Sequence, residues 1–202
     1  MNAPNPLGHA AVAAIEILER RRRRAAIAAR LLASGADAIS AIDWEMLEKA
    51  PAWLALPDAK LATLQRQIGA FLYATEIRLW IDGPRLAAAR AALGETFMQT
   101  LLAQRDLMSI APDAVVRPRI DGAEKVSTHL QVAGAAVLLA SMPQGPLRRA
   151  VTAAMAPTAA AQMAAEIAQS LVARVQALAM QGTSAPPFIT PGAMAATVRS
   201  GA

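Results

Sequence analysis

Apolar residues recur along this chain at intervals of three and four positions, the spacing that places side chains on one face of an α-helix. The clearest stripe lies in the segment 57–81 and continues to Ile77, Trp80 and Ile81; its first members are Leu61, Leu64, Ile68, Phe71 and Leu72. Similar stripes begin near residues 9, 84, 123 and 158. The pattern predicts an all-α protein, a single helical domain of about six to seven helices.

The first predicted helix covers residues 9–33, and Gly35 is expected to end it. Its apolar stripe consists of Val12, Ile15, Leu18, Ile27, Leu31 and Leu32. Ser40 and Asp43 then resemble a capping box, which predicts a short helix that carries Trp44, Met46 and Leu47 and ends at Pro51.

An apolar cluster, Trp53, Leu54 and Leu56, precedes Pro57, which suits the first turn of the next helix. Tyr73 in that helix is expected to be partly buried, with its hydroxyl reaching water or a partner.

Asp82, Gly83 and Pro84 predict a joint between two helices, in which Asp82 caps, Gly83 permits a tight or left-handed conformation, and Pro84 fixes the first turn. The helix that follows, residues 84–105, contains Gly94, which indicates close packing or a break.

A non-helical, proline-containing stretch separates the first half of the domain from the second. Residues 106–122 are the least helical part, and the helix over 123–141 should be the most deeply buried, with Gly134 allowing close approach. Helices over 146–155 and 158–180 complete the domain, and Gly182 is expected to close the last one. The predicted organisation is a flexible N-terminus (1–8), a helical domain (9–181) and a disordered, proline-containing tail (182–202).

Composition supports helices and removes several chemistries. Hydrophobic residues make up 55% of the chain and aromatic residues only 3%, and alanine, the best helix former, is abundant. The absence of cysteine excludes disulfides, thiolate zinc sites and cysteine nucleophiles. The longest apolar run, residues 132–142, is shorter than the roughly 20 residues that span a bilayer. We therefore expect a soluble protein, compatible with a reducing cytoplasm, whose association with any membrane would be peripheral or through a partner.

No catalytic, cofactor-binding or metal site is predicted. His9 and His129 lie far apart in the sequence, and no zinc-protease, phosphate-loop or dinucleotide motif occurs. The serines lack a nucleophile-elbow setting. We expect a protein that is not an enzyme and needs no cofactor.

Five consecutive arginines are the one sharp charge feature: Arg20, Arg21, Arg22, Arg23 and Arg24. Five positions wrap more than one helical turn, so they cannot all face one flat partner. Pairs Glu16–Arg20 and Glu19–Arg23 have the favourable i,i+4 polarity. A solvated charged turn, a docking patch for an acidic protein, and contact with nucleic acid or lipid headgroups all remain open. The formal charge of +5 does not decide among them, because codon bias towards arginine explains it equally well.

The ordered motifs of residues 44–157 resemble the SctK/YscK family of type III secretion proteins. The motifs that carry the similarity are Trp53-Leu-Ala-Leu-Pro57, Gln67-Ile-Gly69, Arg78-Leu-Trp-Ile-Asp-Gly83 and Ala88-Ala-Arg-Ala-Ala-Leu-Gly94, followed by Ala133-Gly134, Pro146-Leu-Arg-Arg149 and Met155-Ala-Pro157. Its structural signature consists of Trp53, Leu56, Pro57, Gly69, Trp80, Asp82, Gly83 and Gly94. The resemblance does not cover the arginine-rich first helix or the proline-containing tail.

The resemblance implies a non-catalytic cytosolic adaptor of the injectisome sorting platform, in a pathogen or a symbiont. Such an adaptor links the cytosolic domain of the inner-membrane ring protein to the cytosolic ring subunit, near the ATPase stator. It would bind no nucleic acid and would meet the membrane only indirectly. Two alternatives remain open: an alanine-rich amphipathic surface-binding protein similar to phasins, and a helical DNA-binding regulator.

Overall fold

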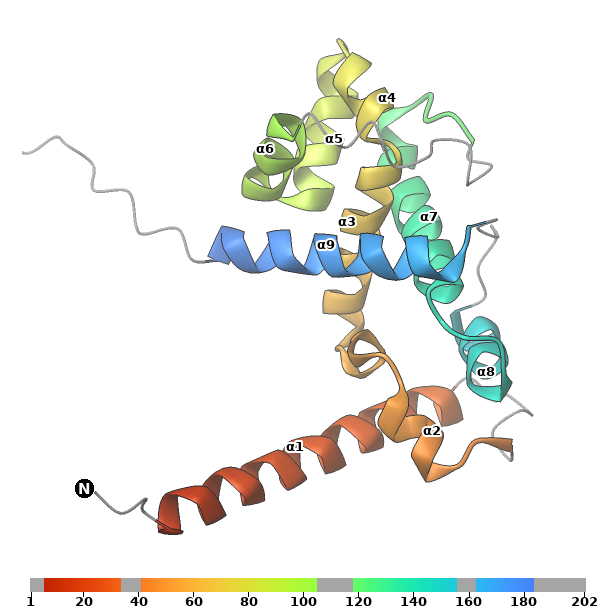
Figure 1. The fold of residues 1–202 in the computed structure, drawn as a ribbon. Helices are drawn as coiled ribbons and strands as arrows, with labels where there is room; N and C mark the ends of the chain where they lie inside the picture. The colour runs from red at the N-terminus through yellow and green to blue at the C-terminus, as the bar shows by residue number, and fades with distance from the viewer. Residues whose placement is uncertain (1–5, 34–40, 105–117, 156–162, 184–202) are drawn as a thin grey trace, which may run out of the picture.

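The fold is all-α, as predicted (Figure 1). The computed structural model describes residues 6–33, 41–104, 118–155 and 163–183. Within these residues there is no strand, and the helices in chain order are α1 (Pro6–Ala33), α2 (Trp44–Lys49), the 3₁₀ turn η2 (Ala52–Ala55), α3 (Asp58–Leu72), α4 (Ala74–Leu79), α5 (Gly83–Leu93), α6 (Glu95–Ala103), the 3₁₀ turn η5 (Ala123–Lys125), α7 (Val126–Ala140), α8 (Pro146–Met155) and α9 (Ala165–Thr183).

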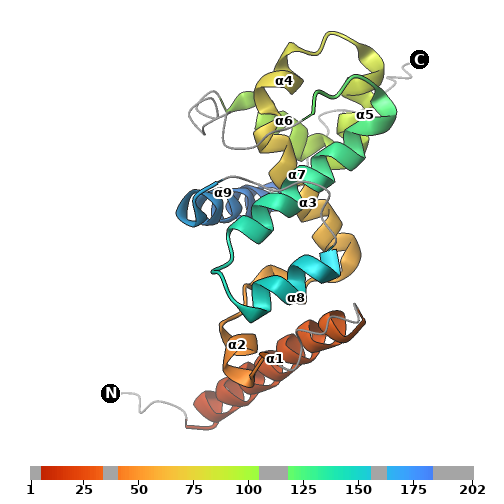
Figure 2. The ribbon, with the colours of Figure 1, turned by 90° about the vertical axis from the view of Figure 1, so that its right-hand side faces the viewer.

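The centre of the molecule is the pair formed by α3 and α7, which lie side by side in both ribbon views (Figures 1 and 2). Their backbones touch at two glycines. A Cβ added at Gly69 would lie 1.9 Å from the carbonyl oxygen of Leu130, and one added at Gly134 would lie 1.8 Å from that of Gln65. The reciprocal contacts show that the two helices run in opposite directions.

The two central helices are also the most buried elements. The predicted stripe of α3 is entirely buried, and residues 133–140 of α7 are buried without interruption, which confirms the expectation for both segments. The buried faces combine leucine with alanine and glycine. Alanine and glycine have small side chains, which let the two backbones lie close together.

Other helices surround this pair in two groups. Helices α4, α5 and α6 cover one end, where Phe71 of α3 and Phe97 of α6 place their ring centroids 6.1 Å apart. Helix α9 crosses the middle and packs on α3, α6 and α7. Helices α1, α2 and α8 lie at the opposite end, where α1 contacts η2, α2 and α8 (Figure 2).

Two predicted helices are each split in two. The expected helix over 57–81 breaks at Tyr73, which separates α3 from α4, and the expected helix over 84–105 breaks at Gly94. Gly94 has φ of 83°, a left-handed conformation that favours glycine. These breaks turn the chain twice, so that α4, α5 and α6 fold back over one end of the core.

The joint before α5 is partly as predicted. Asp82 is the N-cap, and its carboxylate accepts a hydrogen bond from the backbone N–H of Arg85 at 2.8 Å. The expected left-handed role of Gly83 is wrong, because Gly83 is the first residue of α5 and does not have a positive φ. A helical start needs no special backbone freedom when a carboxylate caps it.

Five side chains differ from their predicted environments. Tyr73 is fully buried, and its hydroxyl donates to the carbonyl oxygen of Pro118 at 2.9 Å instead of reaching water. Ile81 is 98% exposed because the chain leaves α4 at Trp80 and turns outward before Asp82. In the first helix, Val12, Ile15 and Leu18 are exposed, since no described element covers that half of α1.

Several helix boundaries also shift. Helix α1 begins at Pro6, three residues before the expected start, because proline is well suited to a first helical turn. Helix α9 begins at Ala165 and runs to Thr183, so Gly182 lies within it and does not close it. Predictions for Gly35, Ser40, Pro157 and most of the tail fall outside the described residues.

Candidate functional site

The five arginines of the predicted docking patch divide between two environments. Arg23 and Arg24 are half-buried against α2, whereas Arg20, Arg21 and Arg22 are exposed. The division follows from helical geometry, because five successive residues point around the whole circumference of α1.

Arg23 and Arg24 hold α1 to α2. The guanidinium of Arg23 donates to the carbonyl of Ala50, the C-cap of α2, and so it does not form the expected pair with Glu19. Arg24 lies 3.8 Å from the carboxylate of Glu48, and its guanidinium lies 5.9 Å from the centre of the Trp44 ring. Carbonyls at a helix C-terminus carry partial negative charge, which makes arginine a suitable partner.

The three remaining arginines, Arg20, Arg21 and Arg22, are exposed to solvent. Arg20 lies 3.8 Å from Glu16, and both side chains are more than half exposed, so this expected pair contributes little to stability. Arg21 and Arg22 form no ion pair with any residue that the structure describes. The outward charge of the patch therefore comes mainly from these two residues.

Arg30 is a further anchoring residue, which the sequence did not identify. It donates to the carbonyl oxygens of Leu54 and Leu56 at 2.6 and 2.5 Å and to the carboxylate of Asp58 at 2.7 Å. It thus joins α1 to the end of η2 and to the start of α3. Its position seven residues after Arg23 places both on one face of α1, and that spacing was an available signal.

The outward face of α1 carries large apolar side chains. Ile15 is 55% exposed, Leu18 53% and Leu32 64%. Val12 and Ile17 are exposed as well. Single exposed apolar residues are ordinary, but several on one helix indicate a contact surface.

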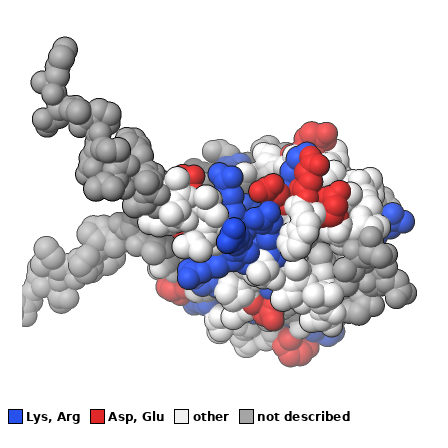
Figure 3. All heavy atoms as spheres, turned by 90° about the horizontal axis from the view of Figure 1, so that it is seen from below, with Lys and Arg blue, Asp and Glu red and all other residues white. Residues whose placement is uncertain are grey.

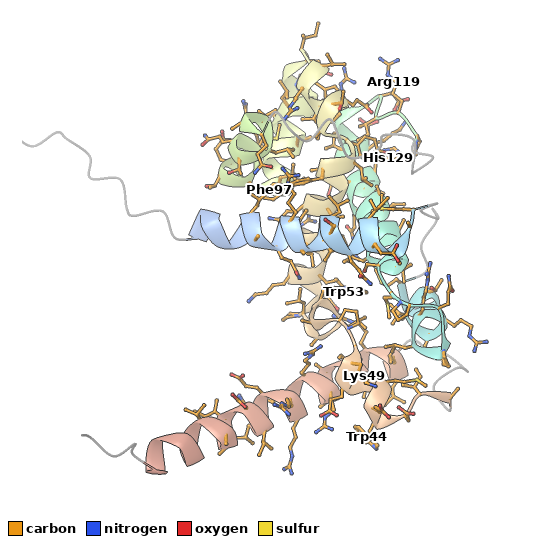
Figure 4. The ribbon with its side chains drawn as sticks, in the orientation of Figure 1. Trp44, Lys49, Trp53, Phe97, Arg119 and His129 are labelled. Atoms are coloured by element: carbon orange, nitrogen blue, oxygen red, sulfur yellow. The ribbon has the colours of Figure 1, made fainter. Side chains whose placement is uncertain are left out.

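Trp44 extends this surface. It is 68% exposed, in contrast to Trp53 and Trp80, which are buried. Figure 4 shows Trp44 at the edge of the molecule, pointing away from the body, whereas Trp53 lies next to α3. Asp43 fixes its position by capping α2: the carboxylate accepts from the N–H of Met46 at 2.8 Å. Nothing in the local sequence distinguishes Trp44 from the buried tryptophans.

Two shallow hollows adjoin Trp44 on its two sides. One, of about 310 Å³, is lined by Arg21, Arg24, Ala25 and Trp44. The other, of about 230 Å³, lies between α1 and α2 and includes Leu31, Leu32, Ile42 and Leu47 in its lining. Figure 3 shows the basic side chains of this end of the molecule gathered in a band, with uncharged surface on one side and both uncharged and acidic surface on the other. We call Ile15, Leu18, Arg21, Arg22, Leu32 and Trp44 the α1–α2 surface.

A wider groove of about 780 Å³ lies between α1, η2, α3 and α8. Its charged groups, Arg30 and Asp58, already bind each other. Its other polar lining residues include Gln65 and Gln131, and no titratable pair faces a common point within it. The groove therefore presents no arrangement for acid–base chemistry.

The residues of the structural signature do not form a site. Trp53 and Trp80 are buried in the core, and Gly69 contacts α7. The others cap, end or begin helices: Leu56, Pro57, Asp82, Gly83 and Gly94. They describe how the helices are joined.

The described residues contain no cluster of three or more His, Asp or Glu side chains that could hold a metal ion. His129 is half-buried in α7, and His9 belongs to α1. None of the described helices has both the length and the apolar character that crossing a membrane requires.

Comparisons of the chain with protein-family models, with curated proteins and with solved structures found no match.

Proposed function

We propose that the protein is a non-catalytic cytosolic adaptor of a type III secretion system, which links the inner-membrane ring to the cytosolic ring of the sorting platform. The motif resemblance to the SctK/YscK family supports the class of protein. The observation that carries an adaptor role is the α1–α2 surface, an apolar and basic face at one end of a closely packed helical body.

The placement of the motif residues is compatible with this proposal. A family signature made of core tryptophans, a glycine contact and helix caps reports a shared way of packing helices. It leaves the outer surfaces free to differ between relatives. An adaptor needs such a body together with distinct faces for its partners.

Co-purification tests the proposal directly. The tagged full-length chain should retain the cytosolic domain of the inner-membrane ring protein and the cytosolic ring subunit, and deletion of its gene should stop secretion. Binding to neither protein, together with normal secretion after deletion, would rule out the adaptor role.

Charge reversal at the exposed arginines refines the test. The double substitution Arg21→Glu and Arg22→Glu should weaken one partnership and leave thermal stability unchanged, because neither side chain has a partner among the described residues. Arg23→Glu should lower stability instead, since Arg23 holds the C-cap of α2. Equal loss of folding and binding in the double variant would contradict a docking role.

The exposed apolar half of α1 also favours a second candidate, the amphipathic surface-binding protein. Its signature would be flotation of the full-length chain with anionic vesicles or polymer granules, lost when Leu18 is replaced by glutamate. Absence of flotation would remove this candidate.

A further inference from the structure

Helix α1 has two different faces. The inner face consists of Arg23, Ile27, Arg30 and Leu31, which are buried or half-buried against α2, η2 and the core. The outer face consists of Ile15, Leu18, Arg22, Ala25, Ala29 and Leu32, and each of these side chains is exposed.

The outer face has the spacing of a coiled-coil seam. Its members follow one another at intervals of three, four, three, four and three residues, the alternation by which a and d positions of a heptad face a partner helix. The inner face occupies the remaining b, c and f positions. A helix that presents a heptad seam away from its own domain is suited to pair with a second helix.

Trp44 lies along one side of this seam. Its ring shares one hollow with Arg21 and Ala25 and the other with Leu32. Exposed tryptophans next to pockets are typical anchors of protein interfaces, because they bury a large area with little loss of conformational entropy. A helix seated on the seam would cover Trp44 at its flank.

Two arginines, against one acidic residue beside the seam (Glu19, at an e position), favour an acidic partner. Arg22 occupies an a position, and Arg21 occupies the adjacent g position; neither has an ion-pair partner among the described residues. An arginine that is enclosed in a helical interface needs a carboxylate opposite it, since a buried unpaired charge is strongly unfavourable. Acidic residues at the facing positions would satisfy both guanidinium groups.

A second copy of the chain would not satisfy them. Whether two α1 helices paired in parallel or antiparallel, any register that overlapped the whole seam would bring the two arginine runs together at its middle. Like charges in such a position oppose association.

We propose that the α1–α2 surface binds an acidic amphipathic helix of a partner protein, which pairs with the seam of α1 and packs against Trp44. The proposal deepens the adaptor function and rests on it for the setting of the partner. The surface itself can be tested without that setting.

The test uses the full-length protein and two synthetic helices of about four heptads, both with leucine at the a and d positions. At the one a position that faces Arg22, and at the e and g positions, the first helix carries glutamate instead and the second carries lysine. Binding is measured by fluorescence anisotropy of the labelled helices. Protection of Trp44 is measured by acrylamide quenching, to which Trp44 is the main contributor because Trp53 and Trp80 are buried.

The acidic helix should bind and reduce quenching, and the lysine helix should bind at least about tenfold more weakly. Leu18→Glu and Leu32→Glu should each lower the affinity for the acidic helix about tenfold or more. Ile81→Glu is the matched control: Ile81 is 98% exposed and follows α4, at the opposite end of the molecule from α1, and its replacement should not change binding.

Four results would overturn the proposal. The first is equal affinity of the protein for the acidic and the lysine helix, and the second is binding of the acidic helix that Leu18→Glu and Leu32→Glu do not alter. The third is unfolding of the protein caused by either substitution. The fourth is a dimer of the chain that Leu18→Glu dissociates. Binding to anionic vesicles without binding to the acidic helix would assign the surface to membranes instead. If the acidic helix binds as expected but the secretion proteins do not co-purify, the surface is correct and the proposed secretion role is wrong.

Discussion

At the scale of single residues, two glycines set how closely the central helices approach. Gly69 and Gly134 each face a backbone carbonyl across the α3–α7 contact, at distances that leave no room for a methyl group. Backbone atoms in paired helices cannot move aside as a flexible side chain can. Both positions therefore require glycine for steric reasons.

Gly69→Ala and Gly134→Ala should each lower the free energy of unfolding by about 2–3 kcal/mol, because the added methyl group forces the two helices apart. Urea unfolding measures the change. Gly83→Ala is the control, since a Cβ at Gly83 meets nothing within 4 Å. Stability of the two core variants equal to that of the control would contradict the close packing of α3 and α7.

Asp82 provides a pH-dependent contribution at the start of α5. The backbone N–H of Arg85, and then its guanidinium, hold the pKa of the Asp82 carboxyl below its usual value. A carboxyl whose pKa is lowered by folding stabilises the folded state above its unfolded pKa, and that stabilisation is lost as the pH falls through the folded pKa.

Asp82→Asn keeps a capping side chain but removes the charge. The variant should be less stable than the wild type at neutral pH, and the difference should disappear as the pH falls below about 4. Thermal unfolding across this range measures it. A difference that does not change with pH would assign the contribution of Asp82 to its cap alone.

At the scale of elements, arginines join helices by binding carbonyl groups at the ends of their neighbours. Arg23 binds the C-cap of α2, Arg30 binds the end of η2, and Arg78 donates to the carbonyl of Leu101 near the end of α6 at 3.1 Å. Each guanidinium satisfies carbonyls that have no partner within their own helix. Part of the arginine content of the chain thus serves to assemble the fold.

Arg30→Ala should lower the free energy of unfolding by about 2 kcal/mol, because it leaves two part-buried carbonyls without their charged donor. It should also increase hydrogen exchange in α1. Asp58→Ala should cost less than about 1 kcal/mol, since the carboxylate of Asp58 is 97% exposed. If the two variants lost equal stability, the ion pair, and not the carbonyl contacts, would be what docks α1.

At the scale of the whole molecule, stability and recognition are placed in different parts. The core extends from α3 and α7 outward, whereas residues 12–22 of α1 are exposed. Among the described residues of that half, Glu16 and Arg20 form an ion pair, and it lies within α1 itself. The N-terminal half of α1 can therefore be altered without affecting the core.

Deletion of residues 1–19 should change the melting temperature by less than about 4 °C, because the side chains of residues 12–19 are exposed and not part of the core. The same deletion should weaken binding of the acidic helix, since it removes Ile15 and Leu18 from the seam. Calorimetry and anisotropy measure the two effects. A larger loss of melting temperature would show that this half of α1 belongs to the folding unit.

The sequence alone determined the helical class, the stripes of α3 and α7 and the cap at Asp82, because these depend on periodicity and on local backbone chemistry; at Gly94 it left a break and close packing open. It did not distinguish exposed from buried residues of the same type, such as Trp44 from Trp53 or Arg22 from Arg23. Those differences arise where one helix lies on another. Only the tertiary structure decided which face of α1 is docked, since the arrangement of α2, η2 and α8 covers the inner face and leaves the heptad seam exposed.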